Sequence, residues 1–266
     1  MDTLSLAQNI SFAAAMAAFA LSLSPKTAGW WRPAAWTCLA ALTALLIMLW
    51  RETGRPPMSN QHESLLVTAW FAAAASIYAR GRAAQVRPAA LFLLCALLAG
   101  ASLARRDLSP LMPALRSNWL IFHVLTAMAA YAALGVAGVY GAWAFIAKKE
   151  EQAAPAVRSL VKGGFLLLTA GIITGSVWAE AAWGSYWSWD PKEIWSLITW
   201  LFYAGLLHMS KTGRAGHSQS SWHRLRTMPP CSGAAALCRL AVLGLFLVIF
   251  TYLGVNFLLG GLHSYA

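Results

Sequence analysis

Three tryptophans and a tyrosine fall within seven positions, 183–189, in the stretch WGSYWSW. A glycine and two serines separate them, and residues this small let a flat ligand approach the backbone. Such a segment can form an aromatic platform for a large planar macrocycle. The alternative is a tryptophan belt at a membrane interface, although a belt needs only one or two aromatic residues per helix end. Trp183, Gly184, Trp187 and Trp189 are therefore candidate ligand-binding residues.

The next four residues, 190–193, read Asp-Pro-Lys-Glu. Aspartate is a good N-cap, proline suits the first helical position, and a glutamate three residues on completes a capping box. We predict that Asp190 starts a helix, which would fix the aromatic segment rigidly at a helix end. Capping does not exclude a ligand contact, so Asp190 also stays a candidate binding residue.

Of the six histidines, His123 and His208 lie inside apolar runs, and His263 follows the last run. An ionisable side chain inside a membrane span is costly and usually functional. By the topology derived below, His123 and His263 fall on the same membrane face as the aromatic segment. Two imidazoles there could supply both axial ligands of a haem iron. The alternative is that each is an interfacial polar residue.

His208 cannot share that ligand. It lies fifteen residues beyond Glu193, which is roughly 22 Å deeper at the α-helical rise. It either marks a second, inner haem site or is a lone histidine favoured by the dipole at a helix C-terminus. His62 could cap the third helix, and we assign it no ligand role.

Composition identifies the elements that must position these residues. Hydrophobic residues make up 59% of the 266-residue chain, charged residues 11%, and the mean hydropathy is +0.58. Soluble domains carry about a quarter charged residues. Apolar runs long enough for membrane helices, or nearly so, cover 6–23, 34–50, 64–78, 88–104, 119–147, 161–178, 194–209 and 234–259. We predict an all-α polytopic membrane bundle of about eight transmembrane helices.

We expect a single integral membrane domain over 1–266. Its N-terminal four-helix half would be 1–110, and 111–266 would hold the candidate ligand residues, including the segment 183–193. The four cysteines form no Cys-x-x-Cys pair, so we expect neither a redox pair nor a zinc site.

In a soluble protein a net charge of +11 would suggest nucleic-acid binding. Here the positive charges lie in short loops between apolar runs, so they indicate how the helices are oriented across the membrane. Fourteen of the twenty Lys and Arg residues fall in one set of alternate loops, which should face the cytoplasm. Both termini, the segment 183–193 and the start of the fifth span then face outward. We expect membrane lipid as a surrounding partner and no nucleic acid.

At these residues the chain resembles the CcsA (ResC) family of system II cytochrome c biogenesis. The segment WGSYWSWDPKEIWSLITW, 183–200, is similar to the family's WWD domain, and 203–208, 254–256 and 261–265 continue the likeness. Residues 118–123 resemble its first external histidine segment. His62 departs from the family, where this position is often tyrosine, and this departure leaves its role open.

The resemblance implies haem b as cofactor, with His123 and His263 as external axial ligands and His208 as a transmembrane ligand. Haem would cross the bacterial inner membrane outward and be offered to Cys-x-x-Cys-His sites of apocytochrome c, where thiol addition to its vinyl groups gives two thioethers. Because no CcsB-like domain follows Ala266, we expect a separate CcsB-type membrane partner.

Three hypotheses follow. The first is a haem-binding component of a cytochrome c synthase; whether the chain alone is an enzyme stays open. The second is a system I-like haem exporter or chaperone without ligase activity. The third is a structural membrane subunit whose tryptophans only anchor it.

Overall fold

The computed structural model describes residues 3–24, 27, 30–78, 85–106, 116–215 and 233–259, and these residues form helices and short connections. The helices run in chain order as α1 (Thr3–Leu23), α2 (Trp31–Thr53), α3 (Gln61–Tyr78), α4 (Arg87–Leu103), α5 (Asn118–Ile146), α6 (Glu150–Trp183), α7 (Pro191–Ala215), α8 (Gly233–Ile249), the π-helical turn η3 (Phe250–Gly254) and α9 (Val255–Leu258).

Seven of the eight predicted apolar runs each match one helix, with ends at most one residue beyond it, and the run 234–259 covers α8, η3 and α9. The all-helical prediction is therefore confirmed for the described residues. α1, α2, α5, α6 and the continuous stretch Gly233–Leu258 are long and apolar enough to cross a membrane. α4 is apolar but has 17 residues. The expected run 161–178 was too short, because α6 has 34 residues and begins in a polar turn with Glu150 and Glu151. Acidic side chains stabilise the N-terminus of a helix. A search for apolar runs misses such a polar first turn.

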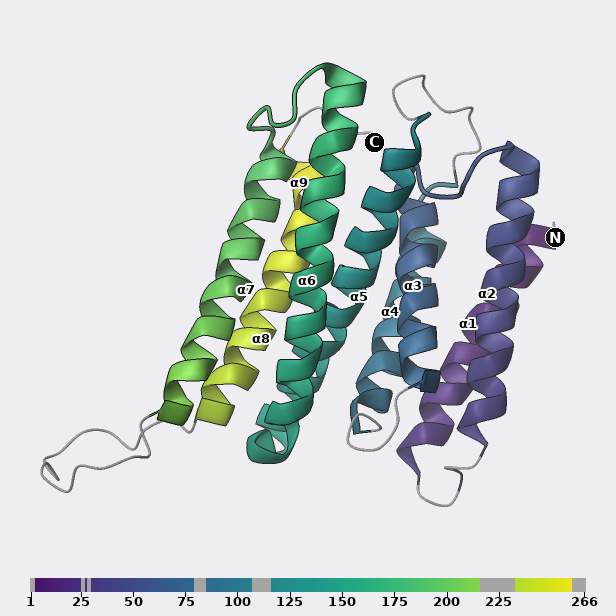
Figure 1. Cartoon of the computed structure of the whole chain (residues 1–266). Coiled ribbons are helices and arrows are strands. Elements are labelled where there is room, and N and C mark those ends of the chain that lie inside the picture. The colour runs from purple at the N-terminus through teal and green to yellow at the C-terminus, as the bar shows by residue number, and fades with distance from the viewer. Residues whose placement is uncertain are drawn as a thin grey trace, which may run out of the picture.

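The helices alternate in direction along the bundle, as Figure 1 shows. One end carries the connection between α6 and α7, and we call it the tryptophan end. α1 begins toward this end and α9 finishes at it (Figure 1).

Two apolar cores run through the bundle. One joins α1–α4 and includes Leu42, Leu45 and Leu94. The other joins α4–α8 and includes Leu134 and Tyr203. A smaller cluster around Trp178 and Met128 lies near the tryptophan end.

Small residues let α5 and α8 approach closely. A Cβ at Gly138 would lie 2.5 Å from Cβ of Leu245, and one at Gly141 would lie 2.9 Å from the Cys238 carbonyl oxygen. Glycines at such positions are the usual means of close helix packing in membranes. Along this contact the two helices form the rigid back of the second core.

The last predicted span, 234–259, is not a uniform α-helix. The π-helical turn η3 separates α8 from α9. Such π-helical turns are rare in proteins, and those that occur are often found at functional sites. Here the turn carries Tyr252, whose hydroxyl lies 2.7 Å from Oγ of Ser64 on α3. The bond ties η3 to α3 in the N-terminal half.

Candidate functional site

A cavity opens at the tryptophan end between the two cores. The centre of a water-sized sphere can occupy about 180 Å³ of it. Its walls come from residues 58–61, from Ser64 on α3, from α5 and α6, from the start of α7, and from η3 and α9. Most of the lining is apolar, with a few polar groups, as is usual for cofactor sites.

His123 lines this cavity from α5. Its Nδ1 lies 2.8 Å from the carbonyl oxygen of Gly171 on α6. A carbonyl only accepts, so Nδ1 carries the hydrogen and the ring's lone pair is on Nε2. A hydrogen bond of this kind is how proteins fix the tautomer and the orientation of a metal-binding imidazole.

Two neighbours hold the His123 ring in place. The indole of Trp178, which is buried, stacks on it with centroids 6.1 Å apart and planes 8° from parallel. On α6, a Cβ at Gly175 would lie 2.6 Å from His123 Nδ1. Only glycine therefore leaves room for the ring at this position.

The aromatic segment is divided between two environments. Trp187 and Tyr186 line the cavity, whereas the side chain of Trp189 is 67% exposed and lies off it. Trp187 and Trp189 meet edge to face with ring centroids 5.8 Å apart. Trp183 packs edge-on against Trp178, with centroids 4.7 Å apart. The segment therefore does not form one continuous shelf.

Backbone geometry explains this division. Gly184 caps α6 at φ 76°, and Trp189 adopts φ 61°. Glycine takes this left-handed conformation easily, but for tryptophan it costs energy. The two reversals turn the chain from α6 into α7 within seven residues and send Trp187 and Trp189 in different directions.

The predicted cap of α7 is confirmed, because the helix starts at Pro191. Oδ2 of Asp190 accepts the N–H of Lys192 at 3.0 Å. Oε2 of Glu193 accepts the N–H of Asp190 at 3.2 Å and that of Ser188 at 2.8 Å. Asp190 and Glu193 are both buried. The two carboxylates thus hold the loop onto the helix end.

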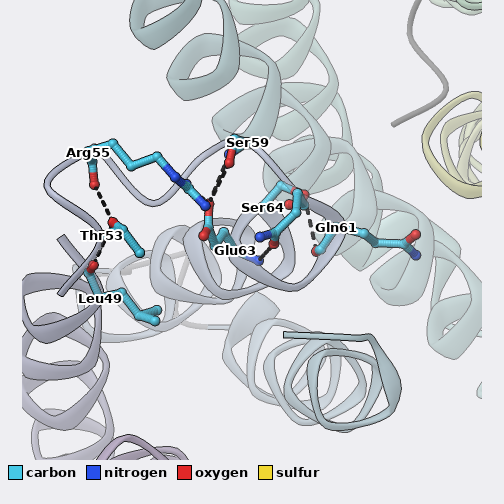
Figure 2. A network of polar contacts seen from close by, with 8 residues as sticks. Leu49, Thr53, Arg55, Ser59, Gln61, Glu63 and Ser64 are labelled. Atoms are coloured by element: carbon cyan, nitrogen blue, oxygen red, sulfur yellow. Dashed lines mark hydrogen bonds and ion pairs between the residues drawn. The ribbon is translucent and has the colours of Figure 1, made fainter. Parts of the chain in front are cut away.

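A second carboxylate network holds the facing wall (Figure 2). Glu63 on α3 forms a buried ion pair with Arg55, with Oε2 and Nη1 2.8 Å apart. The same oxygen accepts the N–H of Ser59 at 2.9 Å. Asn60 caps α3 by accepting the Glu63 N–H at 2.9 Å. Residues 58–61, which line the cavity, are thereby fixed to the helix.

The start of α7 places a basic side chain, that of Lys192, in the cavity wall. Lys192 and Asn256 both line it, and the lysine Nζ donates to Oδ1 of Asn256 at 2.9 Å. The sequence patterns predicted a binding role for neither residue, nor for Trp178 or Tyr252. Residues 254–256 did belong to the stretch that carries the family resemblance, which was the available signal.

The remaining predicted site residues are distributed as follows. His123 and Trp187 meet at the cavity, whereas Trp183, Gly184, Trp189 and Asp190 support or flank it. His208 is exposed in the C-terminal part of α7, the helix whose N-terminus lies at the tryptophan end. His263 lies outside the described residues. In the described part of the chain, no cluster of three or more His, Cys, Asp or Glu side chains could hold a bare metal ion.

Sequence comparison finds many relatives. Proteins named "Cytochrome c biogenesis protein CcsA" include one from Synechococcus sp. (strain RCC307), 35% identical over 267 residues, with 84% of this chain and 80% of the relative covered. Another, from Prochlorococcus marinus (strain MIT 9313), is 33% identical, with 94% and 92% covered.

A solved structure shares the fold. The Cytochrome c Heme Lyase CcmF superposes with a TM-score of 0.69 at 18% identity, covering 94% of this chain and 48% of that protein. The chain thus spans about half the length of CcmF, and the likeness concerns the fold alone.

A family profile described as Cytochrome C assembly protein matches residues 58–263, which include both walls of the cavity. With that match and relatives similar over nearly their whole length, this multi-pass membrane protein belongs to the CcsA family of cytochrome c assembly proteins.

Proposed function

We propose that the protein carries haem across the bacterial cytoplasmic membrane and presents it for covalent attachment to apocytochrome c. It would act with a CcsB-type membrane partner. Its family membership supports a role in cytochrome c assembly. The names of its relatives favour this role over that of a system I-like exporter.

The observation that carries the proposal is the setting of His123. Its Nδ1 donates to Gly171, which directs the Nε2 lone pair to serve as a ligand, and its ring is held against Trp178. A neutral imidazole with one nitrogen anchored is the usual axial ligand of haem iron. The glycine at position 175 keeps the space that the ring needs.

The cavity also suits the macrocycle. Its lining is mainly apolar, and Trp187 offers an aromatic face on the wall formed by the start of α7. Trp183 and Asp190 would act through the residues they hold, and Trp189 would contribute least, because it is exposed. Haem b, held without a covalent link, suits a protein that must release it.

Three further assignments extend the proposal. His263 would be the second axial ligand at this site. His208, exposed on α7, would be a ligand at an inner site completed by the CcsB-type partner. The tryptophan end and both termini would face outward. The whole chain would act as one integral membrane domain, whose cavity is lined by residues 58–61 and Ser64 of the N-terminal half.

Replacement of the proposed axial ligands, compared with replacement of a histidine outside the cavity, tests haem binding. The protein purified from haem-replete cells should show a stoichiometric b-type spectrum. His123→Ala should weaken the outer-site contribution, and the double variant His123→Ala, His263→Ala should lose it. His62→Gln is the matched control, because His62 is buried with its Nδ1 2.8 Å from the Ala101 carbonyl oxygen and does not line the cavity. A colourless wild-type protein would support a structural subunit instead.

A second experiment separates attachment from export. The chain is co-expressed with a CcsB-type partner and a reporter apocytochrome carrying a Cys-x-x-Cys-His site, without other assembly factors. Covalent haem on the reporter supports the synthase role. Release of free haem with no thioether product would support the exporter.

A further inference from the structure

The mainly apolar lining of the cavity includes one basic side chain, Lys192. Lys192 is partly buried, lines the cavity, and donates from Nζ to Oδ1 of Asn256 at 2.9 Å. Asn256 is neutral, so this contact satisfies one N–H and supplies no negative charge. An ammonium has three N–H donors and no acceptor.

Two carboxylates lie near Lys192: Asp190 acts on its charge through space, and Glu193 also lines the cavity. Asp190 accepts the backbone N–H of Lys192, and Glu193 accepts the backbone N–H groups of Ser188 and Asp190. Across the described residues, Arg55 with Glu63 is the one ion pair within 4 Å. Charged groups drawn into apolar surroundings are normally paired. Neither carboxylate forms an ion pair with the Lys192 ammonium, so its remaining N–H donors are placed to meet an anionic group of a ligand.

We infer that Lys192, held by Asn256, binds a carboxylate on the edge of the macrocycle. This inference rests on the proposed haem function and deepens it. Haem carries two propionates on one edge and vinyl groups elsewhere on its rim. Anchoring the carboxylate edge at Lys192 makes the lysine an orienting residue, which determines the edge of the ring that remains available for reaction.

The test uses two probes that differ only in the carboxylates: haem and haem dimethyl ester. Both are titrated into the apoprotein in detergent, and binding is followed by the Soret band. The wild type should bind haem roughly tenfold more tightly than the diester, because a charge-assisted hydrogen bond is the stronger kind. Lys192→Met should lower the affinity for haem to that for the diester. Its affinity for the diester should stay at the wild-type value, which also shows that the variant is folded.

Three variants sharpen the result. Lys192→Arg should restore most of the preference for haem. Asn256→Asp, which places a carboxylate beside the intact lysine, should remove it as Lys192→Met does. Lys162→Met, the same substitution at an exposed lysine on α6, should leave it unchanged.

Other outcomes would overturn the inference. One is an unchanged preference for haem in Lys192→Met. Another is a change of the iron spin state in that variant alone, which would make the lysine an iron ligand. If the wild type binds neither probe, the proposed function itself fails. If it binds both equally with histidine-ligated spectra, only the orienting role of Lys192 fails.

Discussion

The N-termini of α3 and α7 lie on facing walls of the same cavity and are capped alike. Asn60 and Asp190 are the N-caps, and Glu63 and Glu193 occupy the third helical position. In each case the glutamate accepts the N–H of a serine in the preceding loop. The same local device therefore attaches each cavity-lining loop to a helix.

The helix starts of α3 and α7 differ at the second helical position, which is His62 in α3 and Lys192 in α7. His62 is 2% exposed and turns toward α4, where its Nδ1 meets the Ala101 carbonyl oxygen. Lys192 turns toward the cavity and Asn256. One helix start is thus built for packing and the other brings a charge to the site. A shared cap does not imply a shared role, because the neighbouring helices decide where each side chain goes.

The largest expected effect comes from removing the Glu63 carboxylate from its buried ion pair with Arg55. Glu63→Gln takes the carboxylate from Arg55, which is 6% exposed. Breaking one side of a buried ion pair costs about 3 kcal/mol or more. The free energy of unfolding, measured by SDS titration, should fall by that amount. Glu52→Gln, at an exposed position on α2, should leave it unchanged.

Glu193→Gln tests whether the α7 cap contributes as much to stability. Among the described residues no cation pairs with Glu193, so only hydrogen bonds to the Ser188 and Asp190 N–H groups are weakened. Loss of a capping interaction costs about 1 kcal/mol. SDS titration should show this smaller loss, accompanied by lower haem occupancy as the loop holding Trp187 loosens. A loss equal to that of Glu63→Gln would remove the distinction between the two caps.

His62→Gln should affect stability and leave haem affinity unchanged. The variant alters a buried hydrogen bond to the Ala101 carbonyl oxygen, which contributes about 1 kcal/mol. Haem titration and SDS titration on the same sample separate the two effects. A fall in haem affinity without a fall in stability would place His62 at the site, contrary to the comparison.

The smallest effect is expected for Trp189→Ala. Trp187 lines the cavity, so Trp187→Ala should weaken haem binding by about 1 kcal/mol. Trp189 is 67% exposed, so its replacement should change binding by less than about half of that. Haem titration measures both losses. Equal losses in the two variants would support the alternative that both indoles form a single haem platform.

Much of this architecture could be predicted from local sequence. Apolar runs located all eight long helices, because each span must satisfy its own backbone hydrogen bonds in lipid. The order Asp-Pro-Lys-Glu located the start of α7 for an equally local reason. The length of α6 was underestimated, since its first turns are polar and lie outside any apolar run.

The site itself depended on contacts between distant residues. His123 obtains its tautomer from Gly171, 48 positions away, and Lys192 meets Asn256, 64 positions away. The sequence alone determined that the chain forms apolar helices with an aromatic, capped turn near a histidine. Only the tertiary structure decided that Trp187 lines the cavity and Trp189 does not. Both lie in a loop, and the local sequence does not specify how a loop packs against the helices around it.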